Sequence, residues 1–196
     1  MGHAEKSIEA FPTTYGDLAD FPEDERWEIF SGEPFAMSPA PSRRHQEVVW
    51  ELARQIGNFL RERSCQGFVA PFDVRLPEAN EHDDDIATVV QPDIAVICDP
   101  AKLDDRGCRG APDWIIEVIS PNTATNDYIR KVELYERHGV REYWIVHPTD
   151  QVLIIRVLEE NGRYGFPAYH PGNGRCSPRS FPDLELDLDV LFGGAD

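Results

Sequence analysis

Two segments of the chain, residues 89–100 (VVQPDIAVICDP) and 111–121 (APDWIIEVISP), consist largely of apolar residues. Strands that are apolar at nearly every position are typical of the centre of a sheet, where other elements cover both faces. A chain with two such segments is therefore constrained to build a sheet that is covered on both sides. Acidic residues inside these segments are then buried, and a buried carboxylate needs a partner.

Helices that could cover such a sheet are predicted on either side of these segments. In residues 41–64, apolar side chains recur at the 3.6-residue spacing of an amphipathic helix. A second helix is predicted over Asn126–His138, because Gly139 suits a helix end. Further strands are expected at 67–77 and 141–148, hairpins at 27–39 and 151–170, and an edge strand or short helix at 180–192. This order predicts an α/β fold, a mixed sheet flanked by helices.

The length of 196 residues suits a single domain. Within it we distinguish an N-terminal extension and hairpin (1–40), a core (41–148) and a C-terminal hairpin and tail (149–196). No apolar run approaches the roughly 20 residues of a membrane span, and the first residues lack the apolar segment of a secretory signal. We therefore expect a soluble, cytoplasmic protein that does not associate with a membrane.

The four cysteines, at 65, 98, 108 and 176, show no CxxC spacing, and the six histidines form no HExxH or HxxxH pair. Structural zinc is therefore not indicated. Cys98 lies within the apolar segment 89–100. We expect it to be a small buried thiol rather than a metal ligand or half of a disulfide.

Glu117 is the first candidate site residue. Side chains alternate between the faces of a strand, so Glu117 shares one face with Ile115 and Ile119. An ionised carboxylate between two isoleucines in a covered strand costs several kcal/mol unless it has a cation, a hydrogen-bond network or a proton. A buried ion pair with an arginine is the purely structural alternative.

Asp93 shows the same pattern one strand earlier, because it opens an apolar run and points to the side of Ala95 and Ile97. If the two strands are neighbours with their acidic faces aligned, Asp93 and Glu117 meet on one surface. Two close carboxylates repel each other unless a divalent cation lies between them, and oxygen ligands suit Mg²⁺ or Mn²⁺. The alternative for Asp93 is a turn at the strand start after Pro92.

The two predicted helices add a lysine and a histidine. Lys131 lies within the sheet-facing stripe of the second helix, together with Tyr128, Val132 and Tyr135, so we expect it to lean toward the carboxylates. The alternative is that its stem passes a tyrosine and its ammonium reaches solvent. In the first helix, His45 faces inward at the N-terminal end, where it has either an auxiliary role or that of a hydrogen-bonded residue at the edge of the core.

An Asp at the start of one strand, a Glu within the next and a nearby Lys resemble the PD-(D/E)xK nuclease superfamily, which has the restriction-endonuclease-like fold. More closely, the chain is similar to the bacterial Uma-two family of endonucleases. The resemblance rests on the segments RWEIFSGEPFAMSP, QPDIAVI, PDWIIEVISP, NDYIRKVELYERHGV and REYWIV. The lysine of the superfamily motif would stand two residues after Glu117, where this chain has Ile119; the family is similar in moving it into the following helix, where Lys131 matches.

This resemblance implies metal-assisted hydrolysis of DNA phosphodiester bonds by an endonuclease. Asp93, Glu117 and the Val118 carbonyl would hold Mg²⁺ or Mn²⁺, and Lys131 would orient the attacking water or stabilise the transition state. His45 and Glu33 match family positions as possible auxiliary residues, whereas Glu28 suits a hairpin residue equally well. The family also implies a homodimer that reaches both DNA strands.

The net charge of −17, from 36 acidic and 19 basic residues, stands against a DNA partner, because proteins that bind nucleic acid usually carry a basic field. Much of the excess lies in segments expected to be loops or edges, and residues 101–150 hold nine acids and seven bases. Two alternatives therefore stand beside the endonuclease: a binding module on the same fold without catalysis, and a hydrolase of small phosphoesters.

Overall fold

The computed structural model describes residues 12–22, 24–37, 40–119 and 126–193, with only the backbone for 126–128. The helices are α1 (Arg43–Leu60), α2 (Asn126–His138) and α3 (Leu188–Phe192), with 3-10 turns at Gly16–Asp20, Asp83–Asp85 and Pro100–Lys102. The strands are β1 (Trp27–Phe30), β2 (Glu33–Ala36), β3 (Gln66–Val69), β4 (Val74–Arg75), β5 (Val89–Val90), β6 (Ile94–Ile97), β7 (Leu103–Asp104), β8 (Gly107–Arg109), β9 (Trp114–Val118), β10 (Glu142–His147), β11 (Val152–Val157), β12 (Ala168–Pro171), β13 (Arg175–Cys176) and β14 (Leu186–Asp187).

The larger sheet has the order β12-β11-β10-β9-β6-β3. The pair β9–β10 is parallel and is joined through α2, whereas the other neighbours are antiparallel, so the sheet is mixed as predicted. Helix α2 has the predicted bounds, and α1 lies within the predicted segment. The side chain of Tyr128, predicted to face the sheet, lies outside the described residues.

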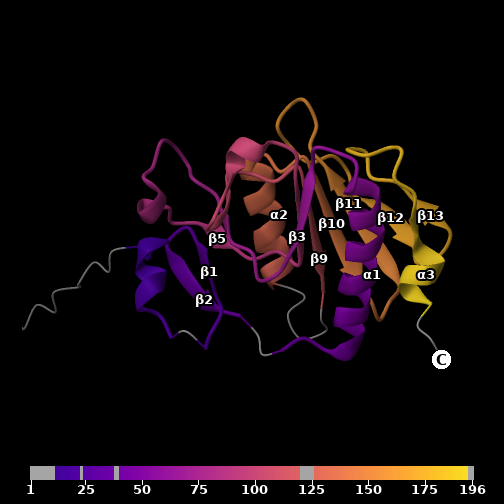
Figure 1. The fold of residues 1–196 in the computed structure, drawn as a ribbon, viewed down its shortest axis with the longest axis horizontal. Helices are drawn as coiled ribbons and strands as arrows, with labels where there is room; N and C mark the ends of the chain where they lie inside the picture. Colours follow the sequence, from indigo (N-terminus) through magenta and orange to yellow (C-terminus); the bar gives the residue numbers. More distant parts are fainter. Residues whose placement is uncertain (1–11, 23, 38–39, 120–125, 194–196) are drawn as a thin grey trace, which may run out of the picture.

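The two faces of this sheet pack against different helices (Figure 1). Trp114, Ile116 and Val118 of β9 pack with the α1 stripe that contains Val48 and Leu52. Ile115, from the other face, packs with Leu134 and Tyr135 of α2. The strand β9 is thus covered on both sides, as its composition predicts, and alternation leaves Glu117 on the face of α2.

Two predicted strands are each divided between two sheets. Segment 67–77 forms β3 in the larger sheet and β4 in a smaller one, and segment 89–100 begins as β5 in the smaller sheet and continues as β6 in the larger. Pro71 and Pro92 stand at the two divisions. Because proline has no backbone N–H to donate to a strand partner, a central strand breaks there.

The smaller sheet has the order β2-β1-β5-β4-β8-β7, so the predicted hairpin at 27–39 is one of its edges. Figure 1 shows this hairpin beside α2. The fully buried Arg75 of β4 forms ion pairs with Asp83 and with Asp104, the latter at 2.6 Å. Part of the acidic run at 81–85 is therefore neutralised inside the fold.

The C-terminal segment completes the face of α1. β11 and β12 extend the larger sheet as the predicted hairpin, and the tail forms both β14 and the short helix α3. Helix α3 lies beside α1 (Figure 1). Gln55 of α1 binds the backbone of Asp187, accepting from its N–H at 2.8 Å. No helix in the described part of the chain has the length and apolar character to span a membrane.

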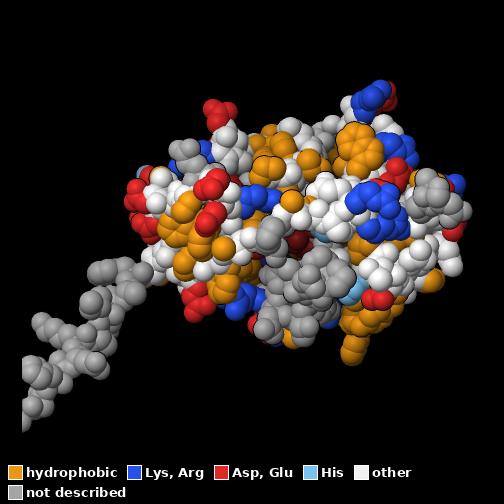
Figure 2. Space-filling model, turned by 90° about the horizontal axis from the view of Figure 1, so that it is seen from below, with side chains coloured by type: hydrophobic (Ala, Val, Ile, Leu, Met, Phe, Trp, Pro, Cys, Tyr) orange, Lys and Arg blue, Asp and Glu red, His pale blue; other side chains and the backbone are white. Residues whose placement is uncertain are grey.

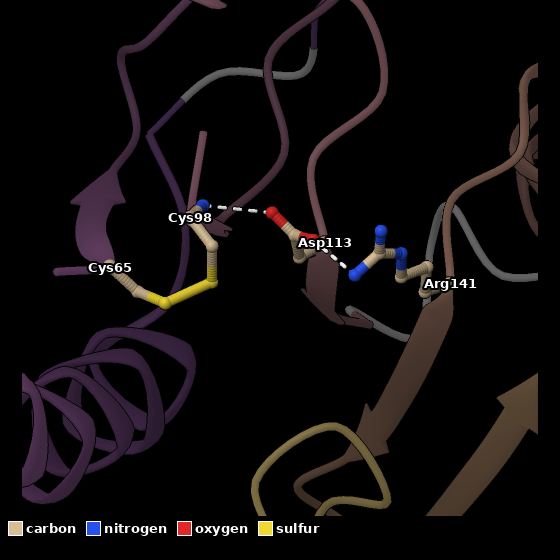
Figure 3. The surroundings of a disulfide bond; sticks show 4 residues. All are labelled: Cys65, Cys98, Asp113 and Arg141. Atoms are coloured by element: carbon tan, nitrogen blue, oxygen red, sulfur yellow. Dashed lines mark hydrogen bonds and ion pairs between the residues drawn. A yellow bond between two sulfur atoms is a disulfide. The ribbon is translucent and has the colours of Figure 1, made fainter. Parts of the chain in front are cut away.

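Cys65 and Cys98 form a disulfide, so the prediction of a free thiol at Cys98 is wrong (Figure 3). The antiparallel register of β3 and β6 pairs Gln66 with Ile97. The two cysteines continue that register as opposed positions, with Cα atoms 3.9 Å apart. The Cys98 N–H donates to the Asp113 carboxylate at 2.8 Å, and Arg141 lies 3.0 Å from the same carboxylate. The sequence concealed this disulfide because its partners are 33 residues apart and meet only through strand pairing.

Candidate active site

The acidic centre forms where β6 begins and β9 ends. The antiparallel register pairs Ile94 with Ile116, and the next opposed positions are Asp93 and Glu117. The predicted adjacency of the two acid-bearing strands is therefore confirmed. The Val118 N–H donates to Asp93 Oδ2 at 2.8 Å, which holds the aspartate against the end of β9.

Lys131 reaches this centre from α2, as its place on the helix predicts. Its Nζ donates to Glu117 Oε1 at 3.0 Å and to Glu28 Oε1 at 3.0 Å. The hydroxyl of Tyr135, one turn further along the helix, donates to Glu117 Oε1 at 2.9 Å. Lys131 is 5% exposed, so its ammonium is held among the carboxylates rather than in solvent.

His45 approaches Asp93 from the first turn of α1. The helix begins where the Ser42 hydroxyl accepts from the His45 N–H at 3.2 Å, a side-chain N-cap. His45 is buried, as predicted, and its Nε2 lies 3.3 Å from Asp93 Oδ2. Burial lowers the pKa of the imidazole, but its interactions with Asp93, Val118 and Glu117 outweigh that effect and raise the pKa above its ordinary value.

Glu117 has a strongly perturbed pKa in this centre. Burial raises the pKa of its carboxyl group to about 8, against the opposing effect of Lys131 and with further increases from Asp93 and Glu28. Burial and the neighbouring Glu117 also raise the pKa of Tyr135 well above its ordinary value. The negative charge around Glu117 therefore exceeds what one ammonium balances, a condition that a bound divalent cation relieves.

Glu28 joins this cluster, although the sequence alone did not distinguish it from a hairpin residue. It is 5% exposed on β1 and accepts hydrogen bonds from Lys131 and from the backbone of Gln91. The available signal was its place between Trp27 and Ile29, which makes a buried acid in a short apolar strand. Glu33 is exposed on β2, and within the described residues it has no hydrogen bond or ion pair with the cluster.

The donor atoms fit a hard divalent cation. Asp93 and Glu117 supply carboxylate oxygens on opposed strand positions, and the Val118 backbone follows Glu117 directly. Among the residues that the structure describes, no three His, Cys, Asp or Glu side chains form a metal-binding group. The expected ligand set contains two carboxylates and a backbone carbonyl, so it needs no third side chain.

Two exposed arginines lie close in sequence to site residues, despite the acidic total. The face shown in Figure 2 has acidic surface recessed in a hollow, with Lys and Arg side chains at several places around it. Arg43 precedes His45 by two residues and has a side chain that is 86% exposed. Arg130, next to Lys131, is exposed and lies over the Phe35 ring at 4.2 Å.

Comparison with known proteins agrees with the fold and with the sequence motifs. A crystal structure described as a putative nuclease of DUF820 from Anabaena variabilis ATCC 29413 superposes with a TM-score of 0.73 at 19% identity, covering 93% of this chain and 98% of that one. A Synechocystis sp. protein, the uncharacterized slr1290, is 24% identical over 171 residues, 87% of this chain and 85% of its own length. Residues 12–189 match the family Uma2, described as putative restriction endonuclease.

The mixed sheet lies between two helices, and the chain superposes on the Anabaena variabilis structure. Together these two observations define a protein of the restriction-endonuclease-like fold. Within that class, the chain belongs to the Uma2 family. The family and the fold support a nuclease role.

Proposed function

We propose that the protein is an endonuclease that hydrolyses DNA phosphodiester bonds and depends on Mg²⁺, which Mn²⁺ can replace. The observation that carries this proposal is the part-buried contact of Lys131 Nζ with Glu117 Oε1 at 3.0 Å, beside the opposed position of Asp93. An acid pair suits a divalent cation, and an ammonium at its edge adds positive charge where a metal-assisted attack on phosphate develops negative charge.

In this proposal Asp93, Glu117 and the Val118 carbonyl would hold the cation, which would supply an activated water at neutral pH and offset charge on the scissile phosphate. Lys131 directs its ammonium toward the attacking water and the phosphoryl oxygens, where negative charge grows in the transition state. Tyr135 holds one oxygen of Glu117 through its hydroxyl, and His45 holds Asp93 in the orientation that faces Glu117.

Cleavage of supercoiled plasmid by purified protein tests this function. With Mg²⁺ or Mn²⁺ we expect nicked and linear products, and EDTA should abolish them. Asp93→Ala and Lys131→Ala should each reduce the rate by about 10²-fold or more, because each removes a group that acts on the developing charge. Equal cleavage by the wild type and both variants would point to a contaminating nuclease and contradict the proposal.

The same preparations separate the alternatives. Turnover of a small phosphodiester without plasmid cleavage would indicate a phosphoesterase. Retained DNA binding without Mg²⁺ binding, measured by calorimetry, would indicate a binding module on the nuclease fold. Either result would overturn the endonuclease assignment, whereas metal-dependent cleavage that disappears in both variants supports it.

We further propose that the protein acts as a homodimer, because two active sites are the simplest way to cut both strands of a duplex. Sedimentation velocity at several concentrations should give twice the 22.3 kDa mass of the chain. A monomeric mass at the concentrations that support double-strand cleavage would contradict this part of the proposal.

A further inference from the structure

Besides Glu117, a second acid, the buried Glu28, contacts the ammonium of Lys131. Glu28 Oε1 accepts from Lys131 Nζ at 3.0 Å, and both side chains are 6% exposed. Burying a carboxylate costs free energy that an apolar residue in the same strand would not cost. A carboxylate kept here is therefore better explained by what it does for Lys131 than by the stability of the hairpin.

Glu28 also binds the chain that carries Asp93. The same Oε1 accepts from the Gln91 N–H at 2.9 Å, and Gln91 lies two residues before Asp93 in the passage from β5 to β6. The Gln91 side chain is held in turn, accepting from Arg26 Nε at 2.8 Å and donating to Asp73 Oδ1 at 2.8 Å. Glu28 thus links the ammonium on α2 to the backbone that leads into the acidic centre.

We propose that Glu28 is a positioning residue that fixes the Lys131 ammonium at the active site without itself contacting metal or DNA. This role rests on the proposed nuclease function. A lysine side chain has a flexible four-carbon stem, and its ammonium follows the nearest negative charge. A divalent cation that shared Glu117 would repel the ammonium, and the Glu28 carboxylate would help to keep the ammonium in place.

The first test is free of metal and of substrate. The sequence has three lysines, Lys6, Lys102 and Lys131, so the rate at which an amine-reactive reagent labels each can be followed by mass spectrometry. Glu28→Gln keeps the size and one acceptor oxygen but removes the charge. We expect labelling of Lys131 to become severalfold faster relative to Lys102, whose Nζ donates to the Ala111 carbonyl at 2.7 Å.

Glu142→Gln is the matched control. Glu142 is also a fully buried carboxylate, but it binds the Trp144 indole N–H and the backbone N–H groups of Arg179 and Ser180. Its variant should leave the labelling rate of Lys131 unchanged. Glu28→Asp, which keeps the charge at a shorter reach, should give a rate between wild type and Glu28→Gln, and it serves if the glutamine variant fails to fold.

The second test uses cleavage with saturating Mg²⁺. Glu28→Gln should lower kcat by about 10- to 100-fold, as expected for a group that supports a catalytic one, with KM for DNA unchanged. In the Lys131→Ala background the same substitution should change kcat by less than twofold. A positioning role is contradicted if labelling of Lys131 does not respond, or if Glu28→Gln lowers kcat equally in both backgrounds. If the wild type cleaves no DNA, only the nuclease function is overturned. The labelling rates still show whether the charge of Glu28 holds the Lys131 ammonium.

Discussion

At the scale of single residues, Glu117 shows how burial changes acid–base behaviour. Its side chain is 13% exposed and touches both an ammonium and a phenol. Desolvation disfavours the charged carboxylate, and Asp93 and Glu28 add repulsion that Lys131 only partly offsets. Under the proposed function, we expect a proton and a divalent cation to compete for this excess of negative charge.

This competition predicts a pH dependence of stability in metal-free protein. The folded-state pKa of Glu117 lies above the unfolded one, so folding favours the protonated carboxyl group. The stabilisation that this proton gives the folded state is complete below about pH 4.5 and is lost as pH rises through about 8. Urea unfolding in EDTA should show that the free energy of unfolding of wild type, relative to Glu117→Gln, falls by a few kcal/mol as the pH is raised from 5 through 7 to 9.

Glu117→Gln is the reference here because it cannot titrate and keeps the side-chain shape. A difference in unfolding free energy that stays constant from pH 5 to 9 would show that Glu117 titrates alike in both states. Saturating Mg²⁺ should reverse the trend in wild type, since the cation requires the ionised carboxylate.

At the scale of elements, the disulfide fixes the edge strand β3 to β6, at the end of β6 away from Asp93. Cross-linking positions 33 residues apart restricts the unfolded chain, an effect of roughly 3–4 kcal/mol in the chain-entropy treatment. The acidic centre draws on β1, β6, β9, α1 and α2 rather than on β3. Loss of the disulfide should therefore cost stability more than it alters the site.

We expect a reducing agent, or the double variant Cys65→Ser with Cys98→Ser, to lower the free energy of unfolding by that amount in urea titrations. The double variant should be insensitive to the reducing agent, which separates the disulfide from the buried thiols of Cys108 and Cys176. A reduced wild type as stable as the oxidised protein would contradict the prediction.

At the scale of the whole molecule, the net charge of −17 opposes any approach of DNA. Under the proposed function, we expect DNA binding to depend on local basic groups at the site and on divalent cations, and to be weak and sensitive to salt. Arg43 and Arg130 flank His45 and Lys131 in sequence and are exposed. They are the phosphate contacts we expect first.

Fluorescence anisotropy of a labelled duplex with Glu117→Gln, which should not cut, measures this contribution. Adding Arg43→Ala or Arg130→Ala should weaken binding regardless of sequence and reduce the slope of log affinity against log salt by about one each. Arg175→Ala is the control, because Arg175 lies on β13, outside the elements that form the acidic centre, and is ion-paired with Glu185 at 3.6 Å much as Arg43 is with Glu47 at 2.7 Å. Equal slopes for all three variants would place the DNA elsewhere on the surface.

The sequence by itself determined the sheet with helices on both faces, since periodicity and composition report burial directly. It also predicted that Lys131 and the two acids face one region, because helix and strand periods fix the side of each residue.

Only the tertiary structure decided which distant strands meet. Strand pairing brought Cys65 to Cys98, and the smaller sheet placed Glu28 beside Lys131, which is 103 residues away in the chain. Such contacts follow from the register and packing of whole elements, which leave no local signal in the chain.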